Sequence, residues 1–414
     1  MRLLFVAALA LALAACSRAP LKDPAKTYHA GEGPTELRDA LDIGTLRMAL
    51  ERTIRTFEDN APNLPAQYTF GERVISRDQY RRALEALRPE LESWDRFLPF
   101  VRANFEFYEV YGGKDYGEVL STGYYDPVMK GSPRATERFS RPLYRPPGDL
   151  VSIDLAAFAE RNPGLAPLQS LVAEQKSKNP VWRGRYVPET KRVIPYYERA
   201  EIDGEKKPLR GKGLEIVWLD PVDAFFLEIQ GSGVVELPGR SLRVGYAAQN
   251  GAPYLPIGKF LTHVIPLEEM SMQRIRAYLA GVSAQERDAV LFKNPSYVFF
   301  QPLESQSLTY SGAEVTAGRT IATDKFLFPK GVLGFFSIDE PTFASEGDLN
   351  ASGWEARPRF VFDQDTGGAI RGGGRVDLYM GQGPAAARKA GVMKRDGKLW
   401  GLAPKPDFLE RLSK

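Results

Sequence analysis

The amino-acid sequence predicts a mainly β protein with helices at its N-terminal end. Between residues 44 and 60, apolar side chains such as Leu50 and Ile54 recur at helical spacing. After Tyr108 the pattern changes to short apolar runs separated by Pro and Gly. These runs are too short, and their turns too frequent, for an alternating α/β protein. At 414 residues the chain is long enough for two or three domains.

The N-terminal residues have the features of a secretory signal. The stretch MRLLFVAALALALAAC has one charge, at Arg2, and an apolar run that is too short for a comfortable membrane span. Its end resembles a bacterial lipobox, whose cysteine is lipidated after cleavage, and Cys16 is the only cysteine of the chain. We therefore expect a signal peptide over residues 1–15, lipidation at Cys16 and a tether over residues 16–35. Ser17 after this cysteine favours an outer-membrane lipoprotein that faces the periplasm of a Gram-negative cell.

Further helices are expected before and after the first β region. Ser76 and Gln79 form a capping-box pattern in front of a second helix, which Pro89 ends. Residues 91–105 suggest a third helix. Helix returns in MSMQRIRAYLAG and in SAQERDAVLF, and Ser283 begins a capping-box pattern in the second of these.

A β domain is expected as an insert over residues 126–256. A helical segment around residues 154–160 interrupts its strand-like runs. These runs are RPLYRPP, KRVIPYYERAEID, EIVWLD, AFFLEIQGSGVVEL and SLRVGYAAQ. Because the N-terminal helices are too few for a large core of their own, residues 36–125 and 257–414 are expected to form one domain around this insert.

The composition argues against several classes of site. The net charge is only +3, which disfavours nucleic acid as a partner. Two histidines, His29 and His263, leave little for a Ser-His-Asp triad or a histidine-rich metal site. The phosphate-binding pattern GxxxxGK[ST] does not occur. We therefore expect no metal and no cofactor, and a chemistry that depends on carboxylates.

The segment FDQDTGGAIRGGGRVDLYMGQG, residues 362–383, is the strongest candidate for an active site. It places Asp365 at the end of one predicted strand and Asp377 within the next, joined by a glycine-rich loop. Glycines there permit positive φ and close approach of a ligand to the backbone. Burial between apolar strands raises the pKa of a carboxyl group, as a general acid near neutral pH requires. The alternative is that these aspartates cap turns and accept hydrogen bonds from backbone amides.

Several motifs together resemble a known family. The runs ATDKFLFPKG, DTGGAIRG and RVDLY are similar, in that order, to the three-aspartate module of double-psi β-barrels. Upstream, STGYYDPV, DAFFLEIQGSG, GYAAQNGAPYLPIGK, MSMQRIRAYL and NPSYVFFQ resemble the membrane-bound lytic transglycosylase A (MltA) family. The resemblance extends from about Tyr108 to Trp400. It implies a double-psi β-barrel domain built from N- and C-terminal segments, a second β-barrel domain inserted into it, and a groove between the two.

The resemblance also implies a reaction. Members of the family cleave the β-1,4 bond between N-acetylmuramic acid and N-acetylglucosamine in peptidoglycan. The 6-hydroxyl of the muramic acid attacks its own anomeric carbon, so the product has a 1,6-anhydro end and water is not consumed. Since the nucleophile is tethered within the substrate, one carboxyl group can serve as acid and base, where ordinary glycosidases use two.

Individual roles follow from the positions of residues in the family's motifs. Asp377 matches the catalytic acid and base, and Asp365 matches an aspartate that binds substrate or steadies positive charge in the transition state. Asp324 matches the first aspartate of the module and is expected to line the groove or to be structural. Thr122 and Tyr124, in STGYY, are expected at the active site as substrate-binding residues.

Four polar residues of the insert are candidates for sugar binding, because they sit in glycine-punctuated motifs. Their side chains could bond sugar hydroxyl and acetamido groups, or they could instead satisfy turns. These residues are Gln230, Ser232, Tyr246 and Asn250.

The sequence departs from the family pattern near the site. The interval between Asp365 and Asp377 is one residue longer than is common, which leaves its loop geometry open. Asp126 stands where some relatives have Thr, and it either adds a carboxylate near Thr122 or forms an Asp-Pro turn. Asp363 is a further candidate acid, since strand alternation would place it on the same face as Asp365.

Three functions are compatible with these observations. The leading one is a lytic transglycosylase, because a mere clamp has little use for a partly buried acid at position 377. The others are a non-catalytic lipoprotein that holds peptidoglycan in the same groove, and a muramidase that hydrolyses the same bond with a water held by Asp365. The expected partners are peptidoglycan glycan strands, the outer membrane through a lipid anchor, and other murein-remodelling proteins.

Overall fold

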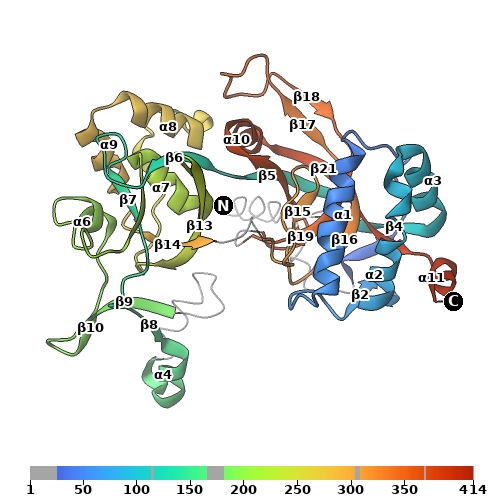
Figure 1. Ribbon diagram of the computed structural model, residues 1–414, viewed down its shortest axis with the longest axis horizontal. Coiled ribbons are helices and arrows are strands. Elements are labelled where there is room, and N and C mark those ends of the chain that lie inside the picture. The colour runs from blue at the N-terminus through green and yellow to red at the C-terminus, as the bar shows by residue number, and fades with distance from the viewer. Residues whose placement is uncertain (1–25, 113–115, 166–180, 304–307, 368–369, 414) are drawn as a thin grey trace, which may run out of the picture. The chain divides into compact units, whose positions relative to one another are not determined.

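The computed structural model describes residues 26–112, 116–165, 181–303, 308–367 and 370–413. These residues form two compact units, and Figure 1 labels many of their elements. Within the described ranges, unit 1 holds residues 26–125, 308–381 and 388–413, and unit 2 holds residues 126–303 and 382–387.

Unit 1 takes its strands from both ends of the chain. They are β1 (Tyr28–Ala30), β2 (Gln67–Phe70), β3 (Arg73–Ser76), β4 (Phe105–Val110), β5 (Glu118–Asp126), β15 (Thr320–Ala322), β16 (Val332–Ser337), β17 (Asp339–Thr342), β18 (Gly353–Ala356), β19 (Arg359–Asp365), β20 (Arg375–Gln382) and β21 (Lys394–Pro404). Its helices are α1 (Ile43–Glu58), α2 (Arg77–Glu85), the 3-10 turn η2 (Pro89–Glu92), α3 (Trp94–Asn104) and α11 (Pro406–Leu412), while α10 (Gly383–Val392) begins in unit 2 and ends in unit 1.

Six strands of unit 1 close into a barrel. Hydrogen bonds join them in the order β16, β19, β15, β20, β5 and β21, and β21 pairs in turn with β16. On its other part, β21 pairs with β4, which carries β1. Because β5 precedes unit 2 in sequence and the other five strands follow most of it, the barrel confirms the prediction that N- and C-terminal segments share one β domain.

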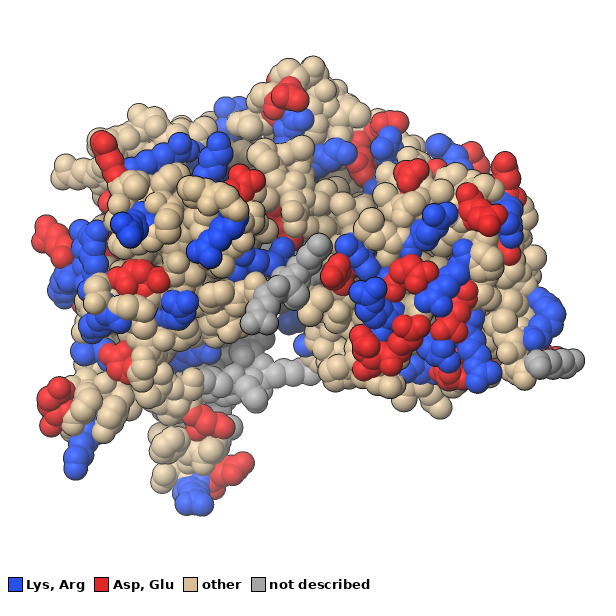
Figure 2. Space-filling view, viewed as in Figure 1, with Lys and Arg blue, Asp and Glu red and all other residues tan. Residues whose placement is uncertain are grey.

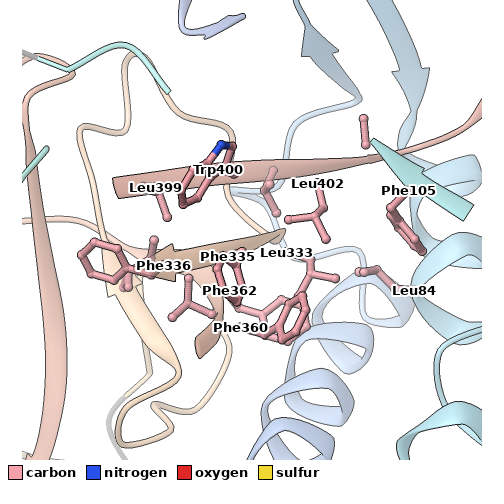
Figure 3. Packing of buried hydrophobic residues seen from close by; sticks show 14 of the residues in the cluster. Leu84, Phe105, Leu333, Phe335, Phe336, Phe360, Phe362, Leu399, Trp400 and Leu402 are labelled. Carbon is pink, nitrogen blue, oxygen red and sulfur yellow. The ribbon is translucent and has the colours of Figure 1, made fainter. Parts of the chain in front are cut away.

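The core of unit 1 lies between this barrel and the N-terminal helices. Figure 3 shows side chains from three strands converging, with Leu333 on β16, Phe360 on β19 and Leu402 on β21. Leu84 of α2 packs into the same buried cluster. The N-terminal helices therefore do not form a core of their own, but cover part of the barrel.

A buried ion pair ties the segment before α1 to the barrel. The side chains of Asp39 and Arg319 are both fully buried and form a salt bridge. Arg319 also donates hydrogen bonds to the carbonyl oxygens of Phe360 (2.9 Å) and Asp42 (3.1 Å). The Asp39 carboxylate accepts from the backbone N–H of Phe360 at 2.7 Å and of Leu41 at 2.8 Å. Every strong polar contact of this pair is thus made inside unit 1.

Unit 2 is a β unit with helices on it. Its strands are β6 (Val128–Ser132), β7 (Arg141–Tyr144), β8 (Leu150–Asp154), β9 (Val181–Val187), β10 (Arg192–Ile194), β11 (Glu215–Leu219), β12 (Ser232–Leu237), β13 (Arg240–Gln249) and β14 (Val298–Leu303). Its helices and 3-10 turns are α4 (Leu155–Arg161), η3 (Pro163–Leu165), α6 (Arg199–Asp203), α7 (Pro221–Gln230), η4 (Ile257–Phe260), η5 (Leu267–Glu269), α8 (Met272–Gly281) and α9 (Ala284–Leu291).

The main sheet of unit 2 has six strands in the order β14, β13, β12, β6, β11 and β7. Residues of its two end strands, β14 and β7, also approach each other. A separate three-stranded sheet contains β8, β9 and β10. The predicted second β domain is therefore present.

Most of the predicted helices are confirmed, and their caps explain where they begin. The capping box of α2 is complete, because the Ser76 hydroxyl accepts from the Gln79 N–H and the Gln79 side chain accepts from the Ser76 N–H. At the start of α9, Ser283 accepts from the N–H of Glu286 at 3.2 Å. α1, α3, α4 and α8 also lie where the periodicity indicated them.

Two runs that were predicted as strands are helical in part. AFFLEIQGSGVVEL begins within α7 and becomes strand only at β12. Asp220 caps α7 by accepting from the Val222 N–H, Pro221 occupies the first turn, and Gly231 ends the helix with φ +80°. α7 is buried on nearly all sides, so its apolar run has no helical periodicity to reveal it. In KRVIPYYERAEID, only β10 is strand and residues 199–203 form α6.

Unit 2 also extends further along the chain than expected. The insert was predicted to end at Pro256, but β14 pairs with β13 over residues 298–303. α8 contacts α7, and α9 contacts η4, so the helices between these strands pack within unit 2. This correction moves residues 257–303 out of the domain to which the sequence pattern assigned them.

Charged side chains of both signs are mixed on the face of the molecule drawn in Figure 2. In unit 1 several charged side chains form exposed or partly exposed ion pairs, such as Arg88 with Glu51 at 2.9 Å and Arg81 with Asp78 at 2.7 Å. Exposed pairs of this kind contribute little to stability.

Candidate active site

Strand β20 presents Asp377 on the outer side of the barrel. Val376 and Leu378 are buried in the core of unit 1. Because side chains alternate along a strand, Asp377 lies on the opposite face, together with Arg375 and Tyr379. β20 thus buries its apolar side chains in the core on one face and leaves the Asp377 side chain 14% exposed on the other.

The Asp377 carboxylate is held by two neighbouring side chains. Arg375 donates from Nε to Oδ1 at 2.9 Å and from Nη2 to Oδ2 at 3.1 Å. The Thr122 hydroxyl on β5 donates a short hydrogen bond to Oδ1, and Arg375 Nε also lies 3.3 Å from the Thr122 oxygen. Both carboxylate oxygens are therefore oriented before any ligand binds.

Asp365, at the end of β19, has a different set of partners. Its Oδ2 accepts a 3.0 Å hydrogen bond from the Tyr124 hydroxyl, and its Oδ1 accepts from the backbone N–H groups of Tyr310 (3.1 Å) and Thr366 (2.9 Å). Burial raises the pKa of Asp365 above its usual range, while these hydrogen bonds act in the opposite direction.

The two aspartates are brought together by strands that are not consecutive. β19 and β20 were predicted as a pair joined by a loop, but β15 lies between them. Ala322 of β15 is the register partner of Asp365 on one side and of Asp377 on the other. Two strand spacings of about 4.8 Å place the Cα atoms roughly 10 Å apart. On β5, Thr122 bonds one aspartate and Tyr124 the other.

Asp324 holds the glycine-rich loop in place. Its Oδ2 accepts a 2.8 Å hydrogen bond from the N–H of Gly372, and its Oδ1 accepts one of 3.0 Å from the N–H of Phe326. Gly372 has φ +81°, a conformation that favours glycine. Asp324 was expected either to line the groove or to be structural. Its side chain is buried and bonds two backbone N–H groups, and these contacts support the structural role.

Gly373 is required by the protein itself. A Cβ atom at this position would lie 2.2 Å from the carbonyl oxygen of Tyr111, which is far inside van der Waals contact. The sequence had suggested that these glycines let a ligand approach the backbone. At Gly373, the close neighbour is another segment of unit 1.

We expect Gly373→Ala to reduce activity strongly, by about tenfold or more, because a 1 Å displacement near a site can cost about a hundredfold. The added methyl group would push the loop away from Tyr111 and pull on the start of β20. The rate of product release and the melting temperature measure the two effects separately. Gly347→Ala is the matched control, since the only atom near a Cβ there is 4.0 Å away. Full activity in Gly373→Ala would contradict the role given to this contact.

Asp363 does not share the surroundings of Asp365. It is buried and pairs with Lys330 Nζ at 2.8 Å, and it accepts a 2.6 Å hydrogen bond from the Thr323 hydroxyl. Burial raises the pKa of Asp363 to about 6. A register shift in the β15–β19 pairing lies between Asp363 and Asp365, which interrupts the alternation expected of a regular strand. Its internal pairing gives Asp363 a structural role.

The candidate sugar-binding residues of the insert belong to unit 2 and have local partners. Gln230 is the last residue of α7, and its amide Nε2 lies 3.9 Å from Met272 Sδ. Ser232 begins β12. Tyr246 is 47% exposed, and its hydroxyl accepts from Arg183 at 3.0 Å.

Asn250, by contrast, is buried, and its amide is fully used within the protein. Nδ2 donates to the carbonyl oxygens of Tyr197 and Pro295, and Oδ1 accepts from the N–H groups of Ala252 and Tyr297. These bonds correspond to the structural alternative for this residue.

The structure also shows the contacts of Asp126, whose role the sequence left open, and of Arg375, which the sequence analysis overlooked. Asp126, at the end of β5, forms a buried ion pair with Arg243 at 2.7 Å within unit 2. Arg375 was not identified from the sequence, although its position two residues before Asp377 on a strand places both side chains on one face. That spacing was the available indication.

The described residues also lack two other kinds of feature. In that part of the chain, no group of three or more His, Cys, Asp and Glu side chains is arranged to hold a metal ion. No helix in the same residues is both long and apolar enough to cross a membrane.

Comparisons with known proteins place this site in context. Residues 120–301 match the family described as "MltA specific insert domain", and residues 319–403 match the "3D domain". The first match ends near the end of β14, as the first segment of unit 2 does, and the second contains Asp324, Asp365 and Asp377.

Three relatives illustrate the similarity. The membrane-bound lytic murein transglycosylase A of Vibrio cholerae serotype O1 is 30% identical over 301 residues, which are 70% of this chain and 67% of that protein. The crystal structure of MltA from Neisseria gonorrhoeae, in a monoclinic form, has a TM-score of 0.64 at 26% identity and covers 94% of this chain and 97% of its own. The structure of Escherichia coli MltA with bound chitohexaose has a TM-score of 0.63 at 22% identity, covers 94% and 96%, and supports the fold.

Proposed function

The chain belongs to the MltA family of membrane-bound lytic murein transglycosylases, and on that premise we propose that Asp377 is the single acid and base of its reaction. The observation that carries the proposal is the position of this carboxylate. Its side chain is 14% exposed on the barrel's outer face, and its two oxygens are oriented by hydrogen bonds from the side chains of Thr122 and Arg375.

The protein is a peptidoglycan lytic transglycosylase, a lyase that acts on the glycan strand. It cleaves the β-1,4 bond between N-acetylmuramic acid and N-acetylglucosamine and leaves a 1,6-anhydro end. Asp377, in its protonated form, gives a proton to the oxygen that leaves with N-acetylglucosamine. The 6-hydroxyl of the muramic acid then bonds to its own anomeric carbon, and Asp377 takes the proton from that hydroxyl. Asp377 ends the cycle protonated, as it began.

The neighbouring residues position this carboxyl group. Thr122 donates to Oδ1 and so fixes the orientation of the group toward the substrate. Tyr124 connects β5 to Asp365, whose negative charge stabilises the oxocarbenium-like transition state.

The hydrogen bonds of Asp365 favour this reaction over hydrolysis. A muramidase needs a second carboxylate with an oxygen free to hold and deprotonate water. Two backbone N–H groups already bond Oδ1 of Asp365 and the Tyr124 hydroxyl bonds Oδ2, so a water held by this carboxylate would have to share Oδ2 with Tyr124. An intramolecular nucleophile makes that second base unnecessary.

Digestion of purified murein sacculi tests the proposal. A soluble form that lacks residues 1–16 is incubated with sacculi, and the released muropeptides are weighed. Anhydro ends are expected. Products heavier by one water would establish the muramidase instead, and a protein that binds sacculi without releasing anything would be the non-catalytic clamp.

We expect Thr122→Val to lower the turnover number by about tenfold to a hundredfold, because a hydrogen bond to a charged group contributes about 1.5–3 kcal/mol. Val has nearly the same shape but lacks the hydroxyl that orients Asp377. Steady-state release of anhydro-muropeptides measures the effect. Thr122→Ser keeps the hydroxyl and should retain most of the activity. Equal losses in both variants would show that the methyl group, and not the hydrogen bond, matters.

The substrate strand and the membrane anchor complete the proposal. We infer that glycan strands bind next to Asp377 with Tyr124 in contact, and that Tyr246, Gln230 and Ser232 bind sugars on unit 2.

We also infer that the mature protein is an outer-membrane lipoprotein with its lipid on Cys16. Cys16→Ser should release the protein from the membrane fraction. Unchanged membrane association would contradict the anchor. Other murein-remodelling proteins are proposed partners, and co-purification from cross-linked envelopes tests this.

A further inference from the structure

The contact between Arg375 and Asp377 bears on how the reaction begins. In the structure its guanidinium forms a bidentate pair with Asp377. A guanidinium stabilises the charged form of the carboxylate it pairs with. The reaction, however, begins with a protonated carboxyl group that faces the leaving oxygen. The pair that orients Asp377 at rest must therefore open before the first proton transfer.

The geometry allows the pair to open without disturbing the barrel. The Arg375 side chain is 36% exposed, and all three of its contacts with Asp377 and Thr122 are made by Nε and Nη2. The guanidinium contributes to neither the barrel core nor the loop anchor at Asp324. Because the Arg375 side chain is 36% exposed, a second anion can reach the guanidinium from solvent and compete with Asp377 for the same bidentate contact.

The substrate of the proposed function brings such an anion. Each muramic acid carries a lactyl group, and this group either is a free carboxylate or is joined to a stem peptide with carboxylates of its own. A planar guanidinium binds any of these in the same bidentate manner. Lys394, the register partner of Thr122 on β21, is an exposed cation on the neighbouring strand, but it has no hydrogen bond or ion pair with Asp377.

We propose that Arg375 is a specificity residue that couples recognition of a muramyl carboxylate to release of the acid. When this carboxylate binds, Arg375 turns from Asp377 to the substrate. Asp377 then takes a proton from solvent and is ready to give it to the leaving oxygen. A glycan without a carboxylate leaves Arg375 on Asp377 and reacts slowly. The inference rests on the proposed function and adds to it a selection for charged muramyl units.

Three substrates with the same glycan backbone test this coupling. Native sacculi carry stem-peptide carboxylates. Sacculi whose carboxyl groups have been converted to amides are neutral at these positions. Peptide-free strands, made with an amidase, carry the free lactyl carboxylate. For the natural sequence we expect kcat/KM to be about fivefold lower on amidated sacculi, which is the factor a partly exposed ion pair can supply. The preferred charged substrate shows which of the two carboxylates Arg375 binds.

The variants distinguish coupling from a general effect of charge or folding. Arg375→Gln should process native and amidated sacculi at rates within about twofold of each other. Arg375→Lys retains a cation and should keep part of the preference. Lys394→Gln also removes one positive charge, but from the neighbouring strand, and should keep the full preference for charged sacculi. A natural protein that releases anhydro products equally from charged and amidated sacculi, or an Arg375→Gln variant that keeps the preference, would overturn the inference. Absence of anhydro products from every substrate would instead overturn the proposed function.

Discussion

Asp377→Asn is expected to lower the rate of anhydro-muropeptide release by about a hundredfold to ten-thousandfold, the range that a general acid and base contributes. Asn has nearly the same shape but neither gives up nor accepts the proton in this reaction. Because Asp377 lies on the outer face of the barrel and its backbone pairing with Ala322 is unaffected, the melting temperature should change little. The mass of products from digested sacculi and the binding of the variant to sacculi are the measurements.

Asp396→Asn is the matched control for this substitution. Asp396 is an exposed aspartate on β21, the strand that pairs with β5, and its register partner is Leu120. The Asp396→Asn variant should therefore retain full activity. If Asp377→Asn released anhydro products at the natural rate, another group would have to carry the proton. Asp365 would be the first to consider, with Asp365→Asn as the next variant.

Asp39→Ala is expected to destabilise unit 1 by about 3–5 kcal/mol, since removal of one partner leaves a buried charge without compensation. A domain is usually stable by about 5–15 kcal/mol, so this is a large fraction of the total. Arg319 would keep its bonds to carbonyl oxygens but lose its ion pair with Asp39, and the N–H of Phe360 would lose its bond to the carboxylate. Urea unfolding followed by circular dichroism measures the change in the midpoint.

Two references make this result interpretable. Glu36→Ala breaks an exposed pair with Arg38, 3.2 Å apart and close in sequence, and should cost less than about 1 kcal/mol. The unfolding transition of unit 2 is an internal reference, because Asp39 and Arg319 both belong to unit 1. A midpoint that did not move in Asp39→Ala would mean that solvent reaches Arg319 after the substitution.

Local sequence patterns predicted the elements that depend on local physics. The helices with a polar cap and an apolar face, such as α2 with Ser76 and Gln79, were found because both indications lie within a few residues. α7 was missed although Asp220, Pro221 and Gly231 mark its two ends. Burial on nearly all sides removed its periodicity, and the apolar run was then assigned to a strand.

The site likewise combines residues that local motifs indicate with contacts that depend on the pairing of distant strands. The order of motifs made Asp365 and Asp377 the candidate site residues, and both lie on strands, β19 and β20, where strands were expected. The insertion of β15 between their strands could not be predicted, because it depends on pairing between segments about forty residues apart and more. Contacts such as that of Thr122 with Asp377, 255 residues apart, depend on closure of the whole barrel.

The closure of this barrel has a consequence for the order in which the protein becomes active. β5 emerges from the ribosome before unit 2, whereas β20 and β21, between which it is held, are made only after most of the chain. Contacts so distant in sequence form late in folding, because a long loop must close first. Until then Thr122 has no carboxylate to orient. A chain that lacks β20 has no Asp377 beside Thr122, so the activity requires the closed barrel and not only the segment that carries β5.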